Sequence, residues 1–211
     1  MQNTNFYDIM FIVRGGNYMA NMKTRPITME EYNEIMEALS LGYAGHRPNH
    51  KVAFALYLEA NLGIRISDIV RLTPKSFKKK DNRYCTDITE KKTGKNRTFT
   101  VPYEVMNEIH RYCDKFGIKD NQRIIPITER QVQKQLDFVC DYLKLEDVST
   151  HSFRKFFAMF IYNNNDYDIE LVRELLQHSN ISITEKYLDV GDKRREEALA
   201  KGVKTPNVDI F

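Results

Sequence analysis

One β-type stretch in an otherwise helical pattern limits what this chain can fold into. The segments Tyr84–Thr89 and Thr98–Val101 are rich in residues that favour strands. Between them lies the basic turn Lys92-Thr93-Gly94-Lys95-Asn96, which predicts a β-hairpin with a basic tip. Elsewhere the apolar residues recur at helical spacing. The sequence therefore predicts an α+β fold, mainly α, in which a helical domain carries one small antiparallel sheet.

Capping residues and glycines fix the limits of the first predicted helices. Thr28 with Glu31 three residues later is a capping-box pattern. Gly63 ends a mostly buried helix over 52–62, and a short helix follows from residue 66 or 67 to 72. Later segments repeat the helical spacing and predict further helices within 103–112, 132–143, 153–161, 169–176 and 182–188.

Three parts are expected along the chain. Residues 1–24 form an irregular leader, which a Gly15-Gly16 break marks as a flexible joint. Residues 25–190 form the main domain, and residues 191–211 form a C-terminal tail. Within that tail, Asp192–Ala200 is amphipathic enough for a docking helix. The leader is too short for a hydrophobic core of its own.

Composition excludes several classes of protein. With 42% hydrophobic residues in 211, the chain has enough apolar material for a buried core. The apolar run Ile9–Val13 is too short to span a bilayer and has no basic flank, so we expect a cytoplasmic protein without signal peptide or membrane helix. Cys85, Cys113 and Cys140 form no C-x-x-C pair, which argues against a disulfide scaffold or a zinc finger.

The charge is concentrated in one segment. Residues 71–97 hold ten basic and three acidic side chains, a net charge of +7, whereas the whole chain has only +3. The remainder of the chain is therefore at −4. Such a distribution suits a polyanion held on one face, although a solvated lysine-rich loop explains the charge alone equally well.

Five short motifs contain candidate catalytic residues. Taken singly, each has an ordinary structural explanation: Arg65 would form a salt bridge with Asp68, the histidines would lie in the core or cap helices, and the lysine and the tyrosine are each one of many. The six residues are Arg65, Lys92 at the hairpin tip, His151 and Arg154 in His151-Ser152-Phe153-Arg154, His178, and Tyr187 nine residues after it.

Taken together, these residue types match the needs of one reaction. Attack on a phosphodiester develops charge on the non-bridging oxygens, which two arginines would clamp. A tyrosine would be the nucleophile, a lysine on a hairpin would give a proton to the departing sugar oxygen, and histidines would move protons or bind the phosphate. Neither a carboxylate cluster nor a His/Cys spacing suggests a metal, so we expect no cofactor, with the cations replacing Mg²⁺.

The same residues, in this order, resemble the catalytic domain of the tyrosine recombinases, the phage integrase family. That family has an arginine in G-[LI]-R-x-[ST]-[ED], a hairpin lysine, H-x-x-R, [LI]-x-H-[SA] and a tyrosine about nine residues later. Here these positions hold Gly63-Ile64-Arg65-Ile66-Ser67-Asp68, Lys92, His151-Ser152-Phe153-Arg154, Leu176-Gln177-His178-Ser179 and Tyr187. The resemblance extends from Arg25 to about Val190. Most members of the family carry a separate N-terminal helical domain that completes a clamp around DNA, whereas only 24 residues precede the resembling part here. We therefore expect either a short form similar to the fimbrial phase-variation invertases or a truncated gene.

The resemblance implies a mechanism. Tyr187 would attack the scissile phosphate to form a 3′-phosphotyrosyl bond and a free 5′-hydroxyl. Arg65 and Arg154 would stabilise the transition state, and Lys92 would be the general acid. His151 would act as general acid/base and His178 would donate a hydrogen bond to the phosphate. A partner strand's 5′-hydroxyl would then attack the stored phosphotyrosyl bond, without metal or ATP.

The resemblance also implies partners. These are double-stranded DNA at specific sites, a homotetramer on that DNA with exchange of the C-terminal tails, and accessory DNA-bending proteins. We expect further DNA contacts from cations of the basic segment. These are Arg71, Lys75, Lys91, Lys95 and Arg97.

Three residues depart from the family's commoner pattern, and other functions stay open. Phe153 and Lys155 stand where Leu and His are commoner around the second arginine, and Asp68 stands where Glu is commoner. Lys91 and Lys95 are within reach of the same hairpin tip as Lys92, so the general acid is open among the three. The other readings are a DNA-binding regulator without catalysis, a type IB topoisomerase-like enzyme, and a purely structural helical protein.

Overall fold

The computed structural model describes residues 24–190 except residues 93 and 95. The expectations for the leader, for the C-terminal tail and for Lys95 therefore fall outside the described residues, as does the side chain of Arg97. Within the described part, no helix is both long and apolar enough to cross a bilayer.

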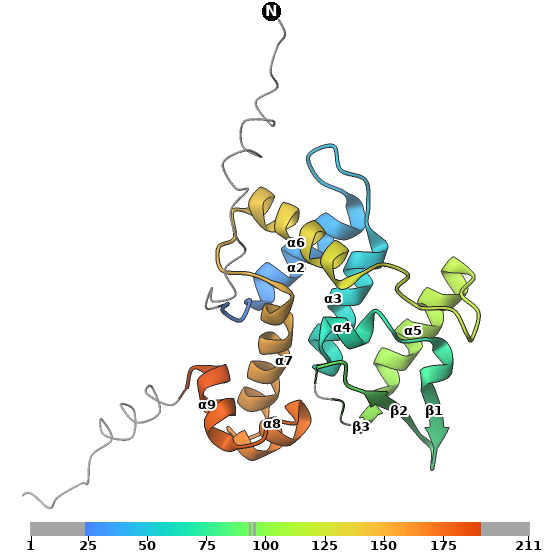
Figure 1. Cartoon of the computed structure of the whole chain (residues 1–211). Coiled ribbons are helices and arrows are strands. Elements are labelled where there is room, and N and C mark those ends of the chain that lie inside the picture. The colour runs from blue at the N-terminus through green and yellow to red at the C-terminus, as the bar shows by residue number, and fades with distance from the viewer. Residues whose placement is uncertain (1–23, 93, 95, 191–211) are drawn as a thin grey trace, which may run out of the picture.

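Helices dominate the fold, and their order follows the sequence pattern (Figure 1). Most lie within one to four residues of the predicted limits. The observed helices are α2 (Met29–Leu41), α3 (His50–Leu62), α4 (Ile66–Ile69), α5 (Tyr103–Phe116), α6 (Glu129–Leu143), α7 (Thr150–Asn164), α8 (Ile169–Leu176) and α9 (Ile181–Leu188).

The predicted capping signals explain the starts and ends of these helices. Thr28 Oγ1 accepts from the Glu31 N–H at 3.2 Å while the Glu31 carboxylate accepts from the Thr28 N–H at 2.8 Å, which confirms the capping box of α2. Gly63 ends α3 in the left-handed conformation with φ 58°. α4 is shorter than predicted, because the chain turns after Ile69.

The sheet has three strands, whereas the sequence analysis predicted two. The antiparallel order is β1 (Phe77–Lys80), β2 (Arg83–Thr89) and β3 (Asn96–Val101), with Thr86 opposite both Phe77 and Phe99. β1 follows a short 3-10 helix, η1 (Pro74–Ser76). Three consecutive exposed lysines hide the strand from pattern analysis, and they also suit an edge strand that must avoid pairing with other chains.

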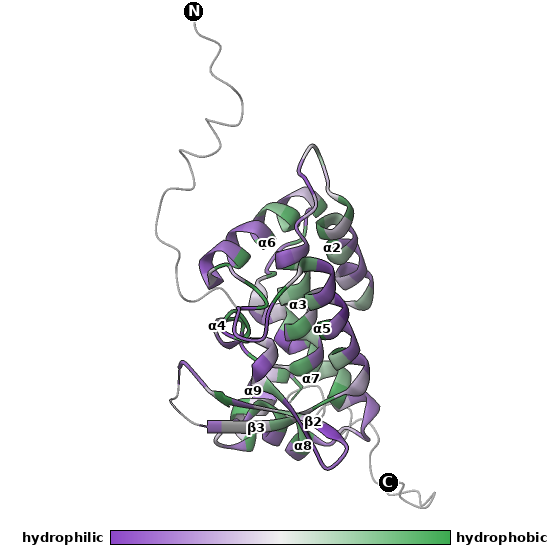
Figure 2. Ribbon diagram, turned by 90° about the vertical axis from the view of Figure 1, so that its right-hand side faces the viewer, coloured by the Kyte–Doolittle hydropathy of each residue, from purple (hydrophilic) through white to green (hydrophobic). Residues whose placement is uncertain are grey.

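Two hydrophobic clusters hold the molecule together. The larger one surrounds α3, whose residues are buried on almost every side, and it includes the inner faces of α2, α5, α6 and the sheet. The smaller one joins the second half of α7 to α8 and α9; we call it the α8–α9 cluster, and it consists of Ala158, Tyr162, Val172, Leu176, Leu188 and Val190. In Figure 1, the sheet and α5 lie on one side of α3, and α8 and α9 gather around the lower end of α7. Figure 2 shows the apolar side of the helices turned inward.

Candidate functional site

Arg65 lies in the tight turn between α3 and α4. It is the residue before the first turn of α4, in an extended conformation with ψ 143°. The turn is held from two directions. The carboxylate of Glu59 accepts a hydrogen bond from the Ile66 N–H at 3.2 Å, and the Gly63 carbonyl accepts one from the Arg154 guanidinium. The sequence around Arg65 therefore fixes the arginine on a rigid support.

The ionic partner of Arg65 is Glu90, and the predicted pairing with Asp68 is wrong. Arg65 Nη1 lies 2.7 Å from Glu90 Oε2 at the end of β2, and Glu90 is only 4% exposed. Arg65 precedes the first turn of α4 in an extended conformation, and the residue that follows β2 packs beside it. Asp68 instead accepts a hydrogen bond from the Lys91 N–H at 2.9 Å. These two carboxylates tie the base of the hairpin to α4.

Arg154 and His151 are one turn apart at the start of α7, as predicted. Arg154 is 2% exposed and donates to the Gly63 carbonyl and, at 3.0 Å, to the Leu176 carbonyl. Burial lowers the pKa of its guanidinium, with Arg65 acting in the same direction, but an arginine side chain stays protonated in proteins. One buried cation therefore connects the α3–α4 turn to the end of α8.

His151 lies in a field of positive charge. Burial of part of the imidazole is the largest cause of its lowered pKa, and four cations lower it further: Arg154, Arg65, Lys92 and Lys155. Because the ordinary pKa of histidine is already near 6.5, the ring is neutral at pH 7. A neutral imidazole can accept a proton.

His178 and Tyr187 approach each other at the start and end of the α8–α9 connection. His178 follows the end of α8, and its Nδ1 lies 3.0 Å from the hydroxyl of the buried Thr184 on α9. Tyr187 lies on α9 three residues after Thr184, with its ring centroid 5.2 Å from that of His178 in an edge-to-face arrangement. The spacing of nine residues therefore brings the two side chains together, as the sequence analysis expected.

The hydroxyl of Tyr187 is buried, and within the described residues it has no well-directed hydrogen-bond partner. Burial raises its pKa, and the nearby Glu59 acts in the same direction, whereas Arg154 and Arg65 lower it. The Arg154 guanidinium is close enough to interact with this hydroxyl, but a buried hydroxyl without a well-directed hydrogen bond is uncommon in folded proteins. The site thus holds a polar atom that a bound group would satisfy.

The structure describes only some of the cations that the sequence analysis expected to contact DNA. Lys91 and Lys92 form the turn after β2, both exposed, and Lys92 is close enough to lower the pKa of His151. The side chain of Arg71 is 52% exposed and lies 3.8 Å from Asp68. Lys75 is exposed on η1, whose main chain bonds to the Asp120 carbonyl. Arg71 and Lys91 also line a cleft of about 610 Å³ together with Arg123, which the sequence analysis did not select.

Two buried carboxylates at the site were missed by the sequence analysis. Glu59 is fully buried, and burial raises the pKa of its carboxyl well above the ordinary value, which Arg154 opposes. Glu90 directly follows β2 and pairs with Arg65. An acidic residue inside the apolar pattern of helix 52–62 was the available signal for Glu59. No comparable signal marked Glu90, because its contact depends on how the sheet packs.

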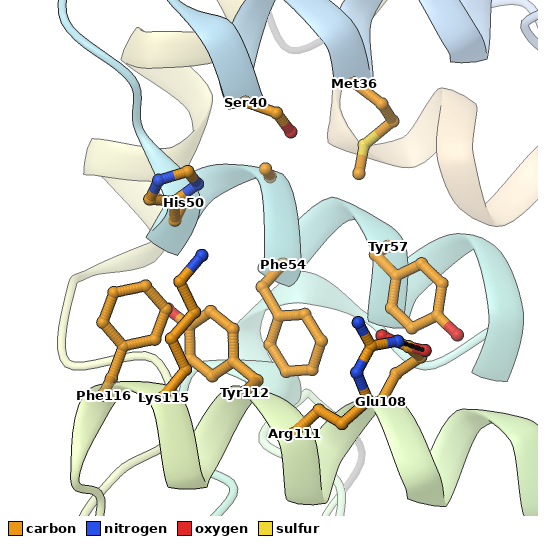
Figure 3. Close-up of a pocket in the computed structure, with 11 residues that line it drawn as sticks. Met36, Ser40, His50, Phe54, Tyr57, Glu108, Arg111, Tyr112, Lys115 and Phe116 are labelled. Carbon is orange, nitrogen blue, oxygen red and sulfur yellow. Dashed lines mark hydrogen bonds and ion pairs between the residues drawn. The ribbon is translucent and has the colours of Figure 1, made fainter.

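A second groove lies away from these residues. It has a volume of about 300 Å³ and lies between α2, α3 and α5, lined by the stacked rings of Phe54 and Tyr112 and by Lys115 (Figure 3). None of the six predicted catalytic residues lines it. Among the described residues, no three His, Cys, Asp or Glu side chains are grouped as a metal site requires.

Comparison with known proteins gives a family match over most of the chain. The model of the phage integrase family matches residues 25–194. The chain is 29% identical over 151 residues to the probable integrase/recombinase YoeC of Bacillus subtilis, covering 68% of this chain and 80% of that protein. It is 26% identical over 186 residues to the tyrosine recombinase XerC of Caldanaerobacter subterraneus, covering 83% of this chain and 50% of that protein. The family match does not single out the fimbrial invertases among its members.

Solved structures agree on the fold. The site-specific recombinase XerH, bound to a palindromic difH substrate in a post-cleavage complex, superposes with a TM-score of 0.63 at 20% identity, covering 87% of this chain and 55% of that one. A λ integrase fragment, a dimer bound to a COC′ core site, superposes with a TM-score of 0.59 at 14% identity, covering 95% and 68%. The chain thus spans about half the length of XerC and of XerH.

Proposed function

Because the chain belongs to the phage integrase family, we propose that it is a site-specific DNA recombinase that cuts and rejoins strands through a 3′-phosphotyrosyl intermediate. The position of the Tyr187 hydroxyl is the observation that supports this proposal most directly. The hydroxyl is buried, has no well-directed hydrogen bond among the described residues, and lies close to the guanidinium of Arg154. A phosphate bound there would accept a well-directed hydrogen bond from the hydroxyl and would also be the electrophile.

The proposed transition state is stabilised by the two arginines. Arg65 is fixed by Glu90, and Arg154 is fixed by two main-chain carbonyls, so both guanidiniums are preorganised. Preorganised cations that meet charge developing on the phosphate oxygens supply much of the rate in reactions of this kind. His178, oriented through Thr184, would donate a hydrogen bond to the same phosphate.

The proposed reaction requires two proton transfers. The phenol of Tyr187 must lose its proton as the oxygen–phosphorus bond forms, and the neutral imidazole of His151 is suited to accept it. The departing 5′-oxygen must gain a proton, and we assign this to Lys92. Lys91 and Lys95 belong to the same hairpin and are the alternatives.

The proposed partner is double-stranded DNA at a specific site, bound along the basic segment. Arg71 and Lys91, with Arg123 beside them, would contact the backbone next to the scissile phosphate, and Lys75, Lys95 and Arg97 would extend this surface. We further propose that the protein works as a homotetramer on DNA with accessory bending proteins, inside the cell. Such an assembly would carry out integration, excision or inversion.

Covalent capture tests the proposal. The protein is incubated with DNA of its source genome in excess EDTA, the mixture is quenched with SDS, and the DNA ends attached to protein are sequenced. We expect discrete ends with wild-type protein and none with Tyr187→Phe, although Tyr187→Phe still binds DNA. The matched control is Tyr167→Phe, because Tyr167 is 58% exposed in the connection between α7 and α8.

Three results would contradict parts of the proposal. DNA ends covalently attached to the Tyr187→Phe protein would show that Tyr187 is not the nucleophile. A strict requirement for Mg²⁺ in the cleavage step would remove the metal-free mechanism. DNA binding by wild-type protein without any capture would favour a regulator that does not cut DNA.

A further inference from the structure

The ammonium group of Lys155 lies against the ring of Tyr187, the proposed nucleophile. Lys155 follows Arg154 directly on α7, at the position where the sequence departs from the commoner histidine. Its ammonium lies 5.3 Å from the ring centroid of Tyr187 on α9. Lys155 is half-buried, so water screens this contact less than it would at the surface.

The ammonium of Lys155 is held in this position by the main chain. Its Nζ donates a hydrogen bond of 2.6 Å to the Thr24 carbonyl, just before α2. A lysine side chain has several rotatable bonds, and a short hydrogen bond at its end reduces that freedom. The cation is therefore directed over the ring rather than left to sample solvent.

The other groups around Tyr187 act on different parts of it. Arg154 and Arg65 affect its hydroxyl from α7 and from the start of α4, and Glu59 on α3 opposes them. The His178 ring meets the Tyr187 ring in an edge-to-face arrangement. Lys155 meets the ring itself, where electron density increases as the phenol becomes a phenolate or attacks phosphorus.

We propose that Lys155 is a positioning residue for Tyr187, whose ammonium keeps the ring docked and favours the attacking form of the phenol. The inference rests on the proposed recombinase function. In the step concerned, the bond from Tyr187 Oη to phosphorus forms as the bond from phosphorus to the 5′-oxygen breaks. The phenol proton passes to His151 or water, the hairpin lysine protonates the 5′-oxygen, and Lys155 keeps its own protons.

The experiment distinguishes a residue that assists attack by Tyr187 from one that assists departure of the 5′-oxygen. Single-turnover rates of covalent-complex formation are measured on the duplex recovered by capture and on the same duplex with sulfur replacing the bridging 5′-oxygen. A thiolate leaves without a general acid, so loss of the hairpin lysine is rescued by sulfur. We expect Lys155→Met to react roughly 3- to 30-fold more slowly on both substrates, and Lys155→Arg to stay within about threefold of wild type.

Lys115→Met is the matched control. Lys115 also holds its ammonium over a ring, 5.6 Å from the centroid of Phe116, but in the groove shown in Figure 3 rather than at the site. We expect its cleavage rate to equal that of wild type. Rates are compared per folded molecule, so that a general loss of stability is not mistaken for a loss of positioning.

Three outcomes would overturn the inference while the recombinase function stands. One is a wild-type rate with Lys155→Met, and another is a Lys155→Met defect that sulfur rescues, because rescue would show that Lys155 assists the leaving group. A slow Lys155→Arg would also contradict it, because the charge alone would then be insufficient. If wild-type protein forms no covalent complex, the proposed function fails first and the inference fails with it.

Discussion

Gly63→Ala is the substitution for which the structure gives the most detailed expectation. Gly63 ends α3 with φ 58°, a conformation that residues with a side chain adopt at a cost. A Cβ atom at this position would overlap the ring of Phe157 on α7. The carbonyl of Gly63 also accepts a hydrogen bond from Arg154, so that a shift of this turn would displace the arginine.

The expected loss of stability has two parts. A left-handed alanine costs about 1–2 kcal/mol. Overpacking against a half-buried aromatic ring costs about 1–3 kcal/mol more, because either the ring or the turn must move. We therefore expect Gly63→Ala to lower the free energy of unfolding by about 2–5 kcal/mol.

Gly117→Ala separates the two contributions. Gly117 ends α5 with φ 62°, and a Cβ atom there would meet nothing within 4 Å. Urea unfolding followed by circular dichroism should therefore give a loss of only about 1–2 kcal/mol for Gly117→Ala. Adding Phe157→Leu to Gly63→Ala should restore part of the loss, which a double-mutant cycle measures as coupling between the two sites.

The reasoning would be refuted if Gly63→Ala destabilised the protein no more than Gly117→Ala does. Absence of coupling between residues 63 and 157 would refute the packing argument alone. Because the turn positions both arginines, Gly63→Ala should also reduce cleavage per folded molecule, whereas Gly117→Ala should not.

Two further predictions concern the buried charges. Arg154→Ala should slow cleavage on the order of 10²- to 10³-fold in a single-turnover assay; it also leaves two buried carbonyls unpaired, so the rate must be normalised to folded protein, and an undiminished rate would remove Arg154 from the site. Because burial raises the pKa of Glu59, the folded protein keeps the carboxyl proton at pH values where the unfolded chain has lost it. The contribution of Glu59 to the free energy of unfolding is therefore complete below the unfolded pKa and is lost as pH rises through the folded pKa. Urea unfolding should therefore show wild type losing stability relative to Glu59→Gln as pH rises above about 4.5, and a pH-independent difference would contradict this.

Local sequence signals predicted most of the helices and the region of the site. The Thr28 capping box and the left-handed Gly63 depend on neighbours within a few residues, so a single sequence contains them. The pairs His151–Arg154 and His178–Tyr187 likewise depend on spacing along or between adjacent helices. Such features do not require knowledge of the tertiary packing.

Contacts between distant elements were not predictable in the same way. Arg65 pairs with Glu90 rather than with Asp68 because the end of β2 packs beside the α3–α4 turn. Lys155 reaches Tyr187 only because α9 folds back onto α7. β1 was missed for a different reason: its lysines lack the alternation of a half-buried strand, and pairing with β2 supplies what the side chains do not.

The α8–α9 cluster allows the segment that contains Tyr187 to unfold locally, separately from the larger cluster. Tyr187 packs against this small cluster, whereas Arg65 lies on the turn beside the larger one. Segments with few buried apolar contacts open locally at a free energy below that of global unfolding. Amide hydrogens of α9 should therefore exchange with solvent before those of α3, and their protection factors would report the fraction of molecules in which the tyrosine is undocked. For the proposed recombinase, a larger undocked fraction would lower the rate of covalent-complex formation.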